Sequence, residues 1–86
     1  MPKSIRAILS EHGGLAGQAE QLEPDADLYR AGLKSLAVVR VMVALEQEYG
    51  VEFRTDMLGR ATFSSISAIA RALDSLGARD VSAERG

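Results

Sequence analysis

The sequence contains no cysteine and no tryptophan, and it has only 2 prolines among its 86 residues. The lack of cysteine excludes disulfide bonds and thiolate metal ligands and fits a reducing compartment, which makes the cytoplasm the expected location. No apolar run approaches the roughly 20 residues of a transmembrane helix, and residues 1–10 lack the apolar segment of a signal peptide. We therefore expect a protein that is neither exported nor embedded in a membrane.

The chain also lacks an excess of basic residues, since 10 Lys and Arg are opposed by 12 Asp and Glu and the net charge is -2. A nucleic-acid-binding protein needs a cationic surface to displace counterions from phosphates, so DNA and RNA are not expected partners. A content of 47% hydrophobic and 26% charged residues is typical of a globular protein. At this length, the composition predicts a single domain with one modest core.

The first predicted helix spans about residues 3–12. Ile5, Ile8 and Leu9 recur at the i, i+3 and i+4 spacing of one helical face, and Gly13-Gly14 supplies a stop signal. Residues 15–34 show no sustained period and are predicted to form a long loop. Four leucines are expected to anchor this loop to the core: Leu15, Leu22, Leu28 and Leu33.

A central helix is predicted from about residue 36 to Tyr49. Residues 36–45 are apolar at every position except Arg40, so a buried strand is also compatible with this run. A helix is favoured because an apolar stripe with helical spacing continues past the usual length of a strand and Gly50 supplies a stop signal. The stripe consists of Val38, Val41, Met42, Leu45 and Tyr49.

A second apolar stripe, made of Leu36, Val39 and Val43, lies on another face of the same predicted helix. A surface helix needs only one stripe of roughly 100° to pack on a core. The second stripe is therefore either wrapped by other helices or exposed as a binding face. We favour the exposed face, because the few helices of so small a domain do not surround a central one completely.

A short helix is predicted after the central one. Either Thr55 or Asp56 can cap its first turn, and the helix continues through Met57 to Ala61. Gly59 has a low helix propensity, so this helix should be brief.

A last helix is predicted to begin at a cap provided by Thr62 or Ser64 and to end at Gly77. Residues 78–86 are polar and aperiodic, and we expect them to fray. The inward face of the helix is predicted to consist of Ile66, Ile69, Ala70, Leu73 and Leu76.

The sequence carries no clear catalytic or metal-binding signature. His12 is the only histidine, and its place at a predicted helix end favours a surface cap, because a cation is favourable there. No G-x-S-x-G or comparable nucleophile motif accompanies it. The acidic residues of the loop do not have the spacing of a calcium-binding loop and are interpreted as solvated: Glu20, Glu23, Asp25 and Asp27. We therefore expect neither enzymatic activity nor a bound metal.

These patterns leave the role of Ser35 open. Its place at the start of the central helix suits an N-cap, whose oxygen accepts a hydrogen bond from a free backbone N–H and stabilises a helix by about 0.5–2 kcal/mol relative to alanine. The same place suits a covalently attached phosphate, because free N–H groups and the helix dipole favour an anion. The chemistry of the residue permits both interpretations and selects neither.

The segment from Asp25 to Phe53, DADLYRAGLKSLAVVRVMVALEQEYGVEF, resembles the signature of acyl carrier proteins. The shared features are an acidic D-x-D-L, a Gly-Leu, a Ser-Leu and a following apolar helix. The resemblance implies an all-α fold: a small, monomeric four-helix bundle with a long loop between helices 1 and 2 and a short third helix. The carrier domain would occupy residues 1–77, followed by a flexible tail at 78–86.

In that family, the serine that matches Ser35 carries 4'-phosphopantetheine, which a phosphopantetheinyl transferase takes from coenzyme A. The arm ends in a thiol that holds cargo as a thioester, so the resemblance implies a carrier and not a catalyst. A ligase that loads the arm and a downstream acceptor enzyme are the other implied partners. The family's main recognition surface is the helix after the serine, which assigns partner binding to Lys34, Leu36, Val39, Arg40 and Val43.

Lys34 is a departure, because the family usually has aspartate immediately before the serine. The lysine reverses the local charge and leaves open which transferase modifies the protein. A narrower resemblance, in G-L-K-S-L, E-F, M-L-x-R and F-x-S-I, is to the freestanding aminoacyl carrier proteins of bacteria, which a stand-alone amino acid ligase loads. The alternatives are an acyl carrier of a fatty-acid or polyketide pathway and an unmodified helical docking module.

Overall fold

Residues 3–78 are described by the computed structural model, and every regular element within them is helical. The α-helices are α1 (Ile5–His12), α2 (Leu28–Ala31), α3 (Ser35–Tyr49) and α4 (Ile66–Ser75), and the 3₁₀ turns are η1 (Ala19–Gln21), η2 (Thr55–Met57) and η3 (Arg60–Phe63). The predicted all-α fold is confirmed. None of the described helices is long and apolar enough to cross a membrane. Apart from Ala78, the predicted tail at 78–86 lies outside the described residues.

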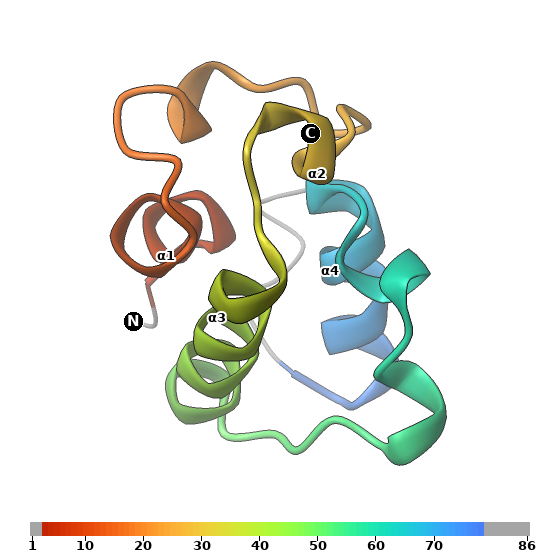
Figure 1. Cartoon of the computed structure of the whole chain (residues 1–86). Coiled ribbons are helices and arrows are strands. Elements are labelled where there is room, and N and C mark those ends of the chain that lie inside the picture. Colours follow the sequence, from red (N-terminus) through yellow and green to blue (C-terminus); the bar gives the residue numbers. More distant parts are fainter. Residues whose placement is uncertain (1–2, 79–86) are drawn as a thin grey trace.

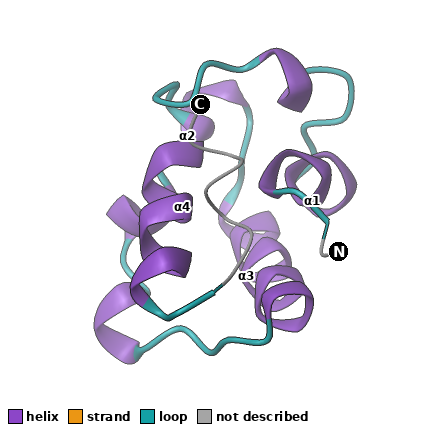
Figure 2. Cartoon of the chain, turned by 180° about the vertical axis from the view of Figure 1, so that it is seen from behind, coloured by secondary structure: helices purple, strands orange, loops and turns teal. Residues whose placement is uncertain are grey.

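The three longer helices enclose one core, and α3 lies between α1 and α4 in both views of the chain (Figures 1 and 2). Helices and loops both contribute buried apolar side chains, which form a single cluster. Its members are Ile5, Ile8, Leu9, Leu15, Ala19, Leu28, Leu33, Val41, Leu45, Phe53, Phe63, Ile66, Ile69, Ala70, Ala72 and Leu73.

The long loop is fixed to α1 and the core. Arg6 of α1 donates hydrogen bonds from its guanidinium to the carbonyl oxygens of Ala19 (2.8 Å) and Leu22 (2.7 Å), a contact that the sequence did not predict. The four leucines predicted as anchors pack in the core or against it: Leu15, Leu22, Leu28 and Leu33. The loop therefore has a defined course over the surface.

The loop also contains α2, a helix that the sequence analysis missed. Asp27 caps α2, with its Oδ1 accepting hydrogen bonds from the N–H groups of Tyr29 (2.9 Å) and Arg30 (3.3 Å). The Leu28 N–H donates to the Ser64 carbonyl at 2.8 Å, which ties α2 to the turn before α4. So short a helix has no period to detect, and its stability comes from its cap and these tertiary contacts.

The predicted short helix after α3 is replaced by two 3₁₀ turns, η2 and η3. Neither Thr55 nor Asp56 caps it, because the cap position of η2 is Arg54 and no side chain accepts a hydrogen bond there. Gly59 separates the two turns with an extended backbone (φ -84°, ψ 169°), so a continuous helix cannot form. The prediction of a brief helical segment was right, but the prediction that it forms one continuous helix was wrong.

The cap of α4 is Ser65, and the predicted caps Thr62 and Ser64 are wrong. The Ser65 Oγ accepts a hydrogen bond from the Ala68 N–H at 3.0 Å, whereas the Ser64 Oγ donates to the Ala61 carbonyl at 2.8 Å inside η3. The predicted inward face of this helix packs in the core or against it, in agreement with the prediction. The helix ends at Ser75, two residues before the predicted stop at Gly77.

Helix α3 presents its two apolar stripes to different environments. Val41 and Leu45 of the first stripe are completely buried, and the other members of that stripe pack partly against the core. The side chains of the second stripe are exposed, with Leu36 at 70%, Val39 at 52% and Val43 at 42%. The predicted orientation of α3 is therefore confirmed.

We expect Val41→Glu and Val39→Glu to differ sharply in stability. Val41→Glu places an unpaired carboxylate in the core and should cost several kcal/mol, a large part of the roughly 5–15 kcal/mol that stabilises a domain. Val39→Glu changes a surface residue and should alter the free energy of unfolding by about 0.5 kcal/mol or less. Urea denaturation followed by circular dichroism measures both. Equal losses would show that the second stripe belongs to the core.

Candidate functional site

Ser35 is the first residue of α3, and its side chain is exposed. Its interpretation as an N-cap is wrong. Lys34 occupies the cap position with an extended backbone (φ -96°, ψ 160°), and no side chain accepts a hydrogen bond from the first turn. Within the described part of the chain, the Ser35 hydroxyl has no hydrogen-bond partner. The hydroxyl is therefore available to react.

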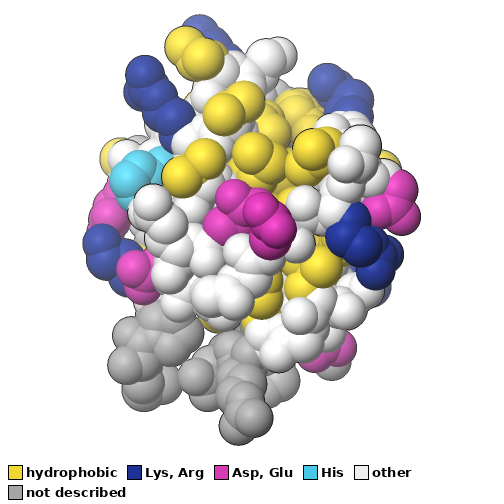
Figure 3. All heavy atoms as spheres, turned by 90° about the horizontal axis from the view of Figure 1, so that it is seen from below, with side chains coloured by type: hydrophobic (Ala, Val, Ile, Leu, Met, Phe, Trp, Pro, Cys, Tyr) yellow, Lys and Arg dark blue, Asp and Glu magenta, His cyan; other side chains and the backbone are white. Residues whose placement is uncertain are grey.

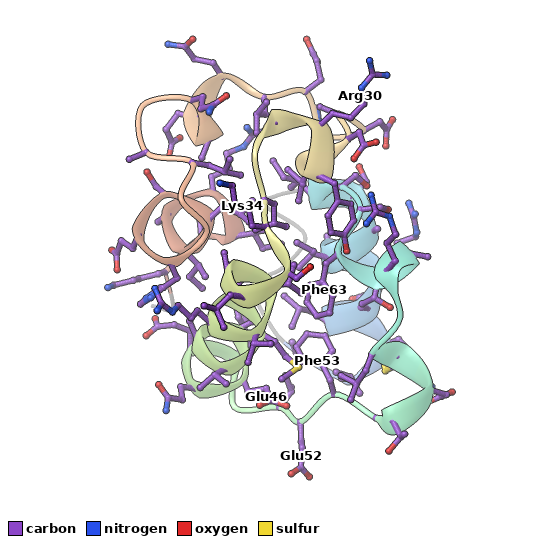
Figure 4. All side chains as sticks on the ribbon, viewed as in Figure 1. Arg30, Lys34, Glu46, Glu52, Phe53 and Phe63 are labelled. Carbon is purple, nitrogen blue, oxygen red and sulfur yellow. The ribbon has the colours of Figure 1, made fainter. Side chains whose placement is uncertain are left out.

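The segment between α2 and α3 fixes where Ser35 emerges. Gly32 ends α2 with a φ of 125°, a conformation that favours glycine. Leu33 is buried, and its N–H donates to the Leu28 carbonyl at 2.9 Å. Leu33 is held in the core, whereas the two residues that follow it are exposed. Lys34 lies at the start of α3 (Figure 4).

The first turn of α3 offers free hydrogen-bond donors beside the Ser35 hydroxyl. The first helical hydrogen bond runs from the Val38 N–H to the Lys34 carbonyl at 3.0 Å. The N–H groups of residues 35–37 therefore have no acceptor within the helix. No acidic residue lies in this turn. Together with the positive end of the helix dipole, these donors favour an anionic group on Ser35.

A pocket of about 190 Å³ opens beside Ser35. The Tyr29 hydroxyl donates a hydrogen bond to the Arg60 carbonyl at 2.8 Å, and the Arg60 guanidinium carbon lies 3.9 Å from the centre of the Tyr29 ring. Partial burial raises the pKa of the Tyr29 hydroxyl above its ordinary value. The pocket is lined by Tyr29, Ser35, Val38, Leu58, Gly59 and Arg60.

The exposed stripe of α3 lies next to this pocket along the helix. Lys34 and Arg40 are exposed on the same helix, which has no acidic residue before Glu46. Leu58 adds a further large apolar side chain, 50% exposed, that the sequence analysis had placed inside a short helix. Figure 3, which shows the molecule from below, has hydrophobic side chains over much of this face, an acidic group near its centre and Lys and Arg side chains farther out.

The other residues singled out in the sequence do not line the pocket beside Ser35. His12 lies in the last turn of α1, as predicted, and lines a separate pocket between α1 and α3 that includes Arg40 and Val43 but not Ser35. Among residues 3–78, no group of three or more His, Cys, Asp or Glu side chains is placed to hold a metal ion. The acidic side chains of the loop are exposed, in agreement with the prediction: Glu20, Glu23, Asp25 and Asp27.

An all-α domain that presents an unpaired serine hydroxyl at the start of its central helix is the architecture of a carrier domain. The chain belongs to the family defined by a phosphopantetheine attachment site, whose model matches residues 3–73. Its members carry 4'-phosphopantetheine and act as carriers for partner enzymes. The predicted family, prosthetic group and lack of enzymatic activity are therefore confirmed.

Individual carrier proteins are similar to this chain over most of its length. The aminoacyl carrier protein of Agrobacterium fabrum is 41% identical over 69 residues, which cover 80% of this chain and 83% of that protein. A crystal structure of an engineered Bradyrhizobium japonicum glycine:[carrier protein] ligase, complexed with a carrier protein from Agrobacterium tumefaciens and ATP, matches with 38% identity and a TM-score of 0.78, covering 83% of this chain and 92% of the matched chain. A holo acyl carrier protein from Nitrosomonas europaea matches with 26% identity and a TM-score of 0.75, covering 83% of this chain and 88% of that one.

The surroundings of Ser35 fit a phosphopantetheine group. The hydroxyl is exposed, and the free amides of the first turn suit a phosphodiester. Arg60 adds a cation to the neighbouring pocket, while Val38 and Leu58 add apolar surface. These residues come from α3 and the η2–η3 segment, which the core holds together.

We expect Ser35→Ala to leave the stability of the apoprotein almost unchanged, because the hydroxyl caps nothing. Ser65→Ala is the matched control, since the Ser65 Oγ does cap α4. The control should lower the free energy of unfolding by about 0.5–2 kcal/mol, and Ser35→Ala by less than about 0.5 kcal/mol. Thermal unfolding of both variants tests this. A cap-sized loss in Ser35→Ala would restore the N-cap interpretation.

Proposed function

We propose that Ser35 is the attachment site of 4'-phosphopantetheine and that this protein is an aminoacyl carrier protein. The observation that carries the assignment is the position of the Ser35 hydroxyl, which is exposed, unpaired and first in α3. Membership of the phosphopantetheine-attachment family supplies the chemistry. When attached, the arm provides a thiol that holds an amino acid as a thioester.

The chain's own part in the modification is to present an oxygen nucleophile. Ser35 Oγ forms the new bond to phosphorus and gives up its proton, while a phosphopantetheinyl transferase supplies the base and expels the nucleotide portion of coenzyme A. The free amides of the first turn and the helix dipole then favour the phosphodiester charge. The prosthetic group is covalently bound, so the carrier keeps its cargo between enzymes at high effective concentration.

The exposed stripe of α3 is the proposed docking surface for the partners. Leu36, Val39 and Val43 supply its apolar centre, and their exposure in a folded domain supports this role. Lys34 and Arg40 lie beside it and would select partners by charge more than by adding affinity. The partners are the transferase, the ligase that loads the arm and a downstream acceptor enzyme.

An amino acid is the proposed cargo because two similar proteins connect this chain with aminoacylation. One is the aminoacyl carrier protein of Agrobacterium fabrum. The other is the carrier complexed with a glycine:[carrier protein] ligase and ATP. A ligase of this kind would load the arm on Ser35 at the expense of ATP. Coenzyme A and ATP are cytoplasmic metabolites, so we propose the cytoplasm as the site of action.

Attachment is tested by intact-mass spectrometry after incubation with coenzyme A, magnesium and a broad-specificity phosphopantetheinyl transferase. The wild type should gain the mass of one phosphopantetheine, and Ser35→Ala should gain none. Ser67→Ala, which removes a serine from α4, is the matched control and should be modified like the wild type. A wild type that stays unmodified beside a modified control carrier would favour the docking module without a prosthetic group.

Docking is tested by steady-state aminoacylation of the holo carrier with a glycine:[carrier protein] ligase. Val39→Glu should raise the KM for the carrier about tenfold, since loss of a central apolar contact costs about 1–2 kcal/mol. Gln21→Glu adds the same charge at an exposed position of η1 and should leave the KM unchanged. Equal KM values for the two variants would place the docking surface elsewhere.

A further inference from the structure

The pocket beside Ser35 has no role in the function proposed so far. Because Ser35 is part of its lining, any group attached to that hydroxyl begins at the pocket edge. The remaining lining comes from Tyr29 of α2, Val38 of α3 and the Leu58–Gly59–Arg60 stretch. Two neighbouring segments, α2 and the start of α3, therefore meet a third that is distant in sequence at the point where the arm would start.

Arg60 is the cationic residue in this lining, and Lys34 is not part of it. Its guanidinium carbon lies 3.9 Å from the centre of the Tyr29 ring, a cation–π contact that leaves the N–H groups of the guanidinium free to donate. Within the described residues, no carboxylate forms an ion pair with Arg60, whereas Arg54 pairs with Asp56 at 3.2 Å. Arg60 thus has the charge and the free donors to bind an anion.

Tyr29 holds Arg60 in this position by two contacts. Its ring supports the guanidinium, and its hydroxyl donates to the Arg60 carbonyl at 2.8 Å. Tyr29 belongs to α2, which the buried Leu28 and Leu33 fix relative to the start of α3. The backbone of Arg60 is therefore tied to α2, close to the start of α3, and its exposed side chain contacts the Tyr29 ring.

The pocket also has an apolar wall and an open rim. Val38 is partly buried and Leu58 is half exposed, so both present aliphatic surface. Gly59 has no side chain, and a Cβ placed on it would meet no atom within 4 Å. The segment of pantetheine next to its phosphate is a branched aliphatic chain, which matches this wall in chemistry.

We propose that Arg60, positioned by Tyr29, binds the phosphodiester of the arm on Ser35, and that the adjoining branched segment rests against Val38 and Leu58. The proposal rests on the proposed function, because it requires an arm on Ser35. The pocket, at about 190 Å³, is smaller than the roughly 300–1,000 Å³ of sites that enclose a whole ligand. It therefore holds the phosphate end and leaves the thiol end free for partner enzymes.

The test compares ¹H–¹⁵N NMR spectra of the apo and holo forms, after mass spectrometry has established that the arm is attached. In the wild type, arm attachment should shift the amide signals of Gly59 and Arg60 as well as those of the first turn of α3. Arg60→Gln should weaken binding of the arm to the pocket about 1.5- to fivefold, the range for an exposed charge pair, and reduce the Gly59 shift accordingly. Arg71→Gln, at an exposed position of α4, is the matched control and should leave the shift unchanged.

Two further measurements separate the effect of the Arg60 charge from the effect of its positioning by Tyr29. Salt at about 1 M, where the Debye length is about 3 Å, should reduce the Gly59 shift in the wild type but have little effect in Arg60→Gln. Tyr29→Phe keeps the ring but removes the hydrogen bond to the Arg60 carbonyl, so it should also reduce the shift. A Tyr29→Phe protein with the wild-type shift would remove Tyr29 from the proposal as a positioning residue.

The outcomes distinguish this inference from the function on which it rests. A holo protein whose spectral changes stay within the first turn of α3, or an Arg60→Gln protein with the wild-type Gly59 shift, overturns the pocket assignment and leaves Ser35 as the attachment site. A protein that gains no arm overturns both. Nuclear Overhauser contacts between the arm's methyl groups and Val38 or Leu58 would confirm the apolar wall.

Discussion

The burial of one side of α3 is the constraint on which the rest of this structure depends. Val41 and Leu45 are fully enclosed, which fixes the rotation of the helix about its axis. Helical spacing then places Leu36, Val39 and Val43 outward, while Ser35 shares the side of Val38 and meets the pocket. The proposed attachment residue and the proposed docking surface are thus oriented by the same packing, although neither contributes to it.

Long-range periodicity made the architecture predictable from sequence. The three longer helices each bury a stripe with regular spacing. Helices α1 and α3 end immediately before the glycine stop signals Gly13 and Gly50. The errors concern features that depend on the backbone of single residues. Lys34 rather than Ser35 is extended before α3, and Ser65 rather than Ser64 is extended before α4, which spacing alone does not distinguish.

Non-local contacts account for what the sequence analysis missed. Phe53 and Phe63 were not predicted as core residues, because each is an isolated aromatic in an irregular segment, yet their rings pack with centroids 5.4 Å apart (Figure 4). Phe53 is also held by its N–H, which donates to the Glu46 Oε2 at 2.9 Å. The Tyr29–Arg60 contact likewise joins residues 31 positions apart. Ser35 itself was selected by resemblance to a family, since residue chemistry left two interpretations open.

The exposed Lys34 at the cap of α3 has a consequence for the cell as a whole. A cell that runs several carrier-dependent pathways must keep their building blocks apart, although the carriers share one fold and one prosthetic group. An enzyme that used basic side chains to read an aspartate at this position would meet like charge in Lys34, and that repulsion would discriminate against this carrier. If Ser35 carries the proposed aminoacyl group, a single neighbouring side chain would thus insulate one pool of activated cargo from crosstalk with other carrier-dependent pathways.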